Sequence, residues 1–121
     1  MRTITDQEFR KVDGLIKGFS DALLGTQPNA VESFMRKLSW GEKMRIGSAK
    51  LAYEFAKNAD PNTKAEKLVQ YCEAVVPALT RTFGEAAVIK ALPVDARTQE
   101  VCDICEQLGG RQTAALIRKS L

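Results

Sequence analysis

Hydrophobic residues recur every three or four positions along most of the chain, and this spacing places them on one face of an α-helix. The first helix is predicted from about Asp6 to Leu24. Its apolar stripe consists of Phe9, Val12, Ile16, Phe19 and Leu23. Gly14 and Gly18 lie inside this segment, and because glycine weakens a helix they indicate close approach of another helix. Gly25 is predicted to end the helix in the left-handed conformation.

Six further helical segments are predicted, separated by proline, glycine or short polar stretches. Their approximate ranges are 28–38, 40–57, 63–84, 85–92, 95–109 and 111–121. In the fourth segment Pro77 lacks a backbone amide and clashes with the preceding turn, so we expect a kink or a break near Val76. Asp95 is expected to cap the sixth helix.

Two of these segments are predicted to turn their large apolar residues toward the core. The face expected for the segment 28–38 consists of Val31, Phe34, Met35 and Leu38. The stripe expected for the segment 40–57 consists of Trp40, Met44, Leu51 and Phe55. Small Gly47 and Ser48 fill the turn between the two halves of that stripe.

Capping boxes support the helix starts. In this motif a serine or threonine is followed three residues later by a glutamate, and each side chain satisfies a free amide of the other. The pairs are Thr5–Glu8, Ser39–Glu42 and Thr63–Glu66. Three such pairs, each leading into an apolar stripe, are stronger evidence than any one of them.

No segment alternates between apolar and polar residues for long enough to predict a strand, and no repeat of solenoid length occurs. The sequence therefore predicts an all-α protein, a compact array or bundle of five to seven short helices. Because the chain has 121 residues, we expect one helical domain over residues 1–121. Small all-helical proteins of this kind are common among bacterial and phage accessory proteins, and no motif ties this chain to a family.

Composition constrains the location and the partners. The apolar stretches are far shorter than the roughly 20 residues that a membrane-spanning helix needs. The segment 1–7 lacks the apolar block of a signal peptide, so a cytoplasmic protein without membrane contact is expected. The net charge of +3 permits an acidic partner but does not predict one.

The residue types in the sequence give little indication of catalytic chemistry. The chain has no histidine, which excludes Ser-His-Asp and Cys-His machinery and histidine-ligated zinc. Cys102 and Cys105 form a C-x-x-C pair, and Cys72 is the third cysteine. A zinc site needs a fourth ligand and a redox pair needs a strand-to-helix context, so buried free thiols are the expectation. We predict no catalytic residue, no metal and no cofactor.

The first candidate binding region surrounds Trp40, the single tryptophan. Its cations are Arg36, Lys37, Lys43, Arg45 and Lys50. Against the one acidic residue of the segment, Glu42, these five cations give a local charge of +4. A basic cluster beside an aromatic residue suits an acidic protein surface or a nucleic-acid backbone. The helical spacing of Trp40 and Met44 instead favours a core role for the tryptophan.

The second candidate is a helix-turn-helix-like hairpin over residues 101–121. Cys105 is the small residue of the first helix, Leu108 is the apolar residue near its end, and Gly109 makes the turn. The polar residues of the second helix are Arg111, Gln112, Thr113, Arg118 and Lys119. Gly110 departs from the pattern, because an apolar residue is usual at that point of the turn.

These features favour a non-enzymatic helical binding or adaptor protein that acts through protein–protein contacts, including contacts with a second copy of itself. Adjacent apolar pairs such as Leu116–Ile117 widen the stripes and are expected to leave surface for an interface. The alternative is a small DNA- or RNA-binding protein that uses the hairpin 101–121 or the basic Trp40 region.

Overall fold

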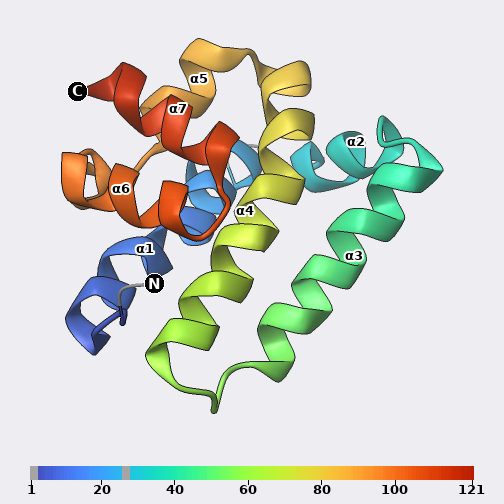
Figure 1. The fold of residues 1–121 in the computed structure, drawn as a ribbon. Coiled ribbons are helices and arrows are strands. Elements are labelled where there is room, and N and C mark those ends of the chain that lie inside the picture. The colour runs from blue at the N-terminus through green and yellow to red at the C-terminus, as the bar shows by residue number, and fades with distance from the viewer. Residues whose placement is uncertain (1–2, 26–27) are drawn as a thin grey trace.

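The computed structural model describes residues 3–25 and 28–121, and these form seven α-helices without a strand (Figure 1). The helices are α1 (Asp6–Phe19), α2 (Ala30–Arg36), α3 (Trp40–Phe55), α4 (Pro61–Phe83), α5 (Glu85–Ala91), α6 (Gln99–Gln107) and α7 (Arg111–Ser120). A π-helical turn, η1 (Ser20–Leu24), extends α1, and a 3-10 turn, η2 (Val94–Ala96), precedes α6. The prediction of an all-α fold of five to seven helices is confirmed.

The core is built around α4, the longest helix. Its nine buried residues are Ala65, Leu68, Val69, Cys72, Ala74, Val75, Val76, Ala78 and Leu79. Figure 1 shows α3 alongside α4 at one edge of the molecule, with α1, α6 and α7 gathered on the other side of α4. Because it is contacted from both sides, α4 buries residues around most of its circumference.

Two of the three predicted capping boxes are confirmed. The Thr5 side chain accepts from the amide of Glu8 at 3.1 Å, and the Ser39 side chain accepts from that of Glu42 at 3.2 Å. The box expected at Thr63 is wrong. Asp60 caps α4 instead, with Oδ2 accepting from the Thr63 amide at 3.2 Å, and Pro61 occupies the first helical position.

Three other local predictions need correction. The cap of α6 is Thr98 rather than Asp95, which lies in η2. Gly25 has a φ of −89°, so it does not end α1 in the left-handed conformation. The break expected near Val76 does not occur, since α4 continues through Pro77 to Phe83. Burial of the neighbouring turns holds the helix together where the proline removes one hydrogen bond.

Gly18 confirms the expected close approach of another helix. A Cβ at Gly18 would lie 3.0 Å from the carbonyl oxygen of Ala91, the last residue of α5, and 2.8 Å from Pro93 in the loop that follows. At Gly14 the same atom would be 3.8 Å from Pro93, which is ordinary contact. The small residue at position 18 therefore lets the Pro93 loop pass over α1.

The core-facing stripe predicted for the segment 40–57 is wrong. Trp40 and Phe55 are 77% and 81% exposed, and Met44 and Leu51 are also exposed. In α2, Phe34 and Leu38 are buried as predicted, whereas Val31 and Met35 are exposed. The adjacent pair Leu116–Ile117, expected to leave surplus surface, does not do so, since both residues are buried. Most of the exposed large apolar side chains lie on α2 and α3.

Candidate functional site

Helix α3 has two apolar faces of different composition. Its inner face, toward α4, carries the buried Ile46 and the partly buried Ala49 and Tyr53. Its outer face, about half a turn away at 100° per residue, carries the larger stripe. The helix therefore packs against α4 through its smaller apolar stripe and presents its larger apolar stripe to solvent.

The outer face is a continuous row of exposed side chains. Met44 and Leu51 are 54% and 52% exposed and stand between Trp40 and Phe55 at the two ends. Since a large aromatic side chain carries roughly 150–250 Å² of surface, Trp40 and Phe55 alone leave about 300 Å² in water. With Met44 and Leu51 added, the exposed apolar area falls within the range of about 300–600 Å² that is typical of the largest patch of a monomer, and that patch is often functional.

Gly47 makes a notch in the middle of this row. A Cβ built on Gly47 meets no described atom within 4 Å, so the notch opens to solvent. Neighbouring Ser48 is also small and exposed. Met35 and Val31 of α2 are exposed as well. We refer to Trp40, Met44, Gly47, Ser48, Leu51 and Phe55 as the α3 outer face.

Polar contacts fix the rotation of α3 about its axis. Arg81 of α4 donates through both terminal nitrogens to the Glu42 carboxylate, each at 2.8 Å. These hydrogen bonds, with one from the Ser39 amide, lower the pKa of Glu42 to about 2. At the other end, the Tyr53 hydroxyl donates to Asp13 Oδ1 of α1 at 3.2 Å. Both anchors lie on the inner side, so the large stripe must point outward.

Lysines line one edge of the α3 outer face. Lys43 and Lys50 are seven residues apart on α3, which places them on one side of the stripe. Both are exposed, and neither forms an ion pair with a described carboxylate. One acidic side chain, Glu54, lies on the same edge. The edge therefore keeps a net positive charge.

The predicted residues of the Trp40 region come together here. Trp40, Lys43 and Arg45 all lie on α3 and are exposed. On α2, Arg36 pairs with Glu32 at 2.8 Å, whereas Lys37 has no carboxylate partner among the described residues. Glu42, which we counted against these cations, is already paired with Arg81. Since Glu32 neutralises Arg36 while Arg81 neutralises Glu42, the net charge of the region stays at the +4 counted from the sequence.

The hairpin candidate folds as a helical pair, α6 and α7. Gly109 has a φ of +88°, as the turn requires. Gly110 is buried, and a Cβ there would lie 2.5 Å from Cγ1 of Val69, so α4 leaves no room for a larger residue. That contact explains the departure from the helix-turn-helix pattern at this position.

Most of the polar residues at the front of α7 are in contact with other residues of the same chain. Glu73 of α4 accepts from the Gln112 amide at 2.9 Å and from the amide and hydroxyl of Thr113 at 3.2 Å. Thr113 is fully buried. Arg118 pairs with Glu106, and Lys119 pairs with Glu85 at 2.9 Å.

Of the five predicted hairpin residues, Arg111 and Gln112 keep exposed side chains without a carboxylate partner among the described residues. Sequence reasoning missed the Glu73 cap, because the acceptor lies on another helix, 39 positions before Gln112. The free cations of the molecule are thus more numerous around α3 than on the hairpin.

The three cysteines are free and buried, as predicted. Burial raises the pKa of Cys105 to about 12 and that of Cys72 well above its usual value. The Cys102 thiol donates to the Ala114 carbonyl oxygen at 3.4 Å. Residues 3–25 and 28–121 contain no cluster of three acidic or thiol groups arranged to hold a metal ion. The C-x-x-C pair therefore joins α6 to the core.

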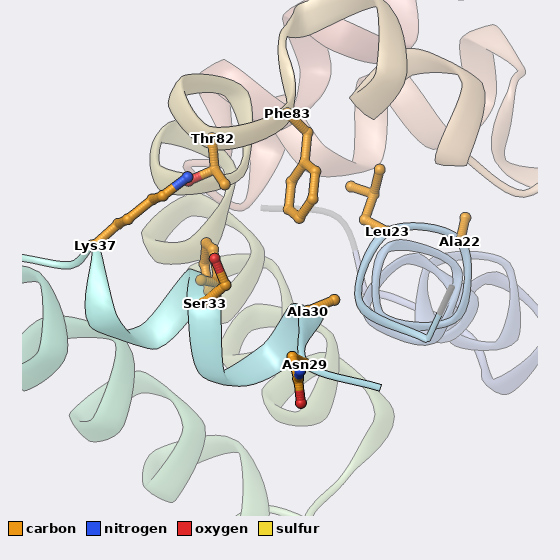
Figure 2. A pocket seen from close by; sticks show the side chains of 9 residues that line it. Ala22, Leu23, Asn29, Ala30, Ser33, Lys37, Thr82 and Phe83 are labelled. Carbon is orange, nitrogen blue, oxygen red and sulfur yellow. The ribbon is translucent and has the colours of Figure 1, made fainter. Parts of the chain in front are cut away.

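A hollow of about 490 Å³ lies between α2, η1 and the end of α4 (Figure 2). Phe83 and Leu23 form its apolar wall, and Lys37 extends along its rim toward Thr82. Lys37 is the one charged side chain in the described lining. The lining thus offers no acid–base pair.

Comparison with family models, with curated proteins and with solved structures gave no match. Among the described residues, no helix combines the length and the apolar character needed to cross a membrane. We therefore infer a function from the surface geometry of this chain.

Proposed function

We propose that this chain is a non-enzymatic binding protein that engages a protein partner through the α3 outer face. The observation that carries the proposal is the outward orientation of Trp40, Met44, Leu51 and Phe55. Complete burial of a large apolar side chain stabilises by about 1.5–3 kcal/mol, and these four residues lose the share of it that corresponds to their exposed surface. A partner that covers them would recover part of that free energy on binding.

The composition of the patch fits a protein interface. Tryptophan, phenylalanine and methionine are enriched at the centres of such interfaces, and lysines are typical of the solvated rim. Trp40 and Phe55 are large anchors at the two ends of the face, and α3 holds them on a rigid helix. Rigid presentation lowers the entropy lost on association.

Site-specific photocrosslinking tests this proposal. Phe55 is replaced by benzoylphenylalanine, and Val94, which is 77% exposed in η2, receives the same residue as a matched control. In extract of the source organism we expect a discrete protein adduct from position 55 and none from position 94. The partner is identified by mass spectrometry, and its complex is rebuilt from the two purified proteins.

The rebuilt complex gives the decisive outcome. Leu51→Glu places a charge at the centre of the face and should weaken the complex by about tenfold or more, since this is a buried-core position of the interface. An adduct of equal yield from positions 55 and 94, or a complex unaffected by Leu51→Glu, contradicts the proposal.

A nucleic-acid-binding function is the second candidate, and one observation favours it: Lys43, Arg45 and Lys50 lack carboxylate partners among the described residues and surround an exposed tryptophan. Such a cluster suits a phosphate backbone with one stacked base. Binding of a fluorescent single-stranded oligonucleotide should then weaken steeply with salt.

The triple change of Lys43, Arg45 and Lys50 to alanine should reduce that salt dependence. The matched change of Arg111, Arg118 and Lys119 to alanine removes the same number of cations from the hairpin and should leave the salt dependence unchanged. An unchanged salt slope in the α3 variant, or the absence of binding at low salt, contradicts this second function.

A further inference from the structure

The α3 outer face is a ridge with a notch, and the notch has the size of a side chain. Gly47 lies between Met44 and Leu51, and its missing Cβ leaves open space. When two helices pack, a large side chain of one enters a gap between residues of the other. The 16 residues of α3 give the face a length of about 24 Å, which suits one helix of similar length.

The lysine edge determines what charge such a helix carries. Lys43 and Lys50 are seven residues apart on α3 and therefore lie along one side of a helix packed against it. Residues at these flanking positions form interhelical ion pairs and select the partner. Two lysines on this edge against Glu54, with Arg45 on the opposite edge, favour a partner with acidic residues along its flanks.

A second copy of this chain does not satisfy that requirement. Two α3 helices that cross antiparallel at their Gly47 notches bring Lys43 close to Lys50 of the second copy on one side. On the other side, Arg45 approaches its own counterpart. In a parallel pair, the edge with Lys43 and Lys50 faces the edge of the second copy that carries Arg45. Like charges next to each other in this way oppose association.

A lipid surface does not use the notch. A bilayer surface is fluid, and its affinity for a helix follows the apolar area that the helix inserts. The glycine at position 47 reduces that area in the middle of the face. The notched face is therefore better matched to a folded protein partner with a protruding side chain.

We propose, building on the protein-binding function above, that the α3 outer face docks an amphipathic helix of another protein. The docked helix has an apolar stripe that fits across Gly47 and acidic residues that face Lys43 and Lys50.

Synthetic helices serve as the probes. Two peptides share one leucine stripe, with glutamates along the flanking edges in the first and lysines in the second, and both lack tryptophan. Binding is followed by the emission of Trp40, the single tryptophan of the chain. We expect the glutamate peptide to bind with a blue shift of Trp40 emission, and the lysine peptide to bind about tenfold more weakly or worse.

Charge reversal tests the lysine edge. Lys43→Glu with Lys50→Glu should reverse the preference, so that the lysine peptide binds more tightly than the glutamate peptide. Arg10→Glu with Lys90→Glu, at exposed positions outside α3, produces the same change in net charge and should retain the original preference. A preference that changes equally in both variants, or that is absent in the parent chain, overturns the acidic specificity.

Gly47→Leu tests the notch. The side chain enters open space, so the fold should persist, and circular dichroism checks this. The change fills the notch but enlarges the apolar face. Docking across the notch predicts about tenfold weaker binding of the glutamate peptide, whereas non-specific apolar adhesion predicts stronger binding. Unchanged or stronger binding overturns the proposed geometry.

The other occupants have their own measurements. If vesicles of phosphatidylcholine and phosphatidylglycerol shift Trp40 emission more than the glutamate peptide does, a lipid surface is the occupant and the proposal fails. If the chain alone sediments as a dimer that Leu51→Glu dissociates, a second copy is the occupant and it fails as well.

Failure of this inference is distinguishable from failure of the proposed function. If neither peptide binds while position 55 still crosslinks to an identified protein, the partner is not an acidic helix but α3 remains the binding surface. If both the peptides and the crosslink fail, the protein-binding function is wrong too.

Discussion

Helices α3 and α4 lie side by side, yet they use their apolar residues in opposite ways. In α4 nine residues are buried. In α3 the one buried residue is Ile46, while four larger side chains face solvent. The difference arises from the neighbours, because α4 is contacted on both sides and α3 mainly by α4 (Figure 1). An apolar stripe on a helix therefore indicates a face that packs against something. It does not indicate whether that is the core of the same chain or a partner.

The first prediction compares thiol reactivity in the two regions. Native Cys72, Cys102 and Cys105 should react with Ellman's reagent about a thousandfold or more slowly than in denaturant, because burial requires the core to open first. A cysteine introduced at exposed Ser48 should react at once, giving one fast equivalent. Fast reaction of a native thiol at neutral pH would contradict the buried assignment and restore a redox hypothesis.

The second prediction uses one substitution in both helices. Leu79→Ala removes a fully buried side chain of α4 and should lower the free energy of unfolding by about 2–5 kcal/mol. Leu51→Ala removes the same atoms from α3 and should change it by less than about 0.5 kcal/mol. Urea denaturation measures both, and equal losses would show that the α3 stripe is covered within the chain.

The third prediction compares two glycines. Gly110→Ala forces a Cβ toward Val69 and should destabilise the fold by about 1–3 kcal/mol. Gly47→Ala meets open space in an exposed helix and should stabilise it by about 0.5–1 kcal/mol. A destabilising Gly47→Ala would mean that a neighbour within the chain occupies the notch.

The fourth prediction, with the smallest expected effect, concerns the stability that the Glu42–Arg81 ion pair contributes at low pH. Hydrogen bonds from Arg81 and from the Ser39 amide lower the pKa of Glu42 from 4.5 to about 2, so these contacts stabilise the folded state above about pH 4.5. The contribution disappears as pH falls toward 2. The difference in urea midpoint between the parent chain and Glu42→Gln should therefore shrink over that range. Glu54→Gln, at a carboxylate without an ion-pair partner among the described residues, is the control and should show no comparable trend.

Much of the fold could be predicted from periodicity and capping. The boxes at Thr5 and Ser39, and the turn at Gly109, depend on neighbouring residues and were correct. Asp60 was missed as a cap because Thr63 followed by Glu66 has the same pattern. Local rules of this kind identify helices but choose poorly between two adjacent starts.

The candidate site was half predictable. The basic cluster around Trp40 is visible in the sequence, but the orientation of α3 is not. That orientation depends on Arg81 and Asp13, which lie far from α3 in sequence and hold its inner side. A smaller inner stripe of Ile46, Ala49 and Tyr53 competes with the larger outer one, and residue size alone favours the wrong face. Likewise, Glu73 shows that the front of α7 is occupied by a distant carboxylate.

The emission of Trp40 shows whether the α3 outer face is exposed, because the chain has one tryptophan and it lies on that face. For the isolated native protein, we expect emission at the wavelength of tryptophan in water, full quenching by acrylamide and almost no red shift on unfolding in urea. Blue-shifted native emission that is protected from acrylamide and moves to the red on unfolding would contradict that exposure.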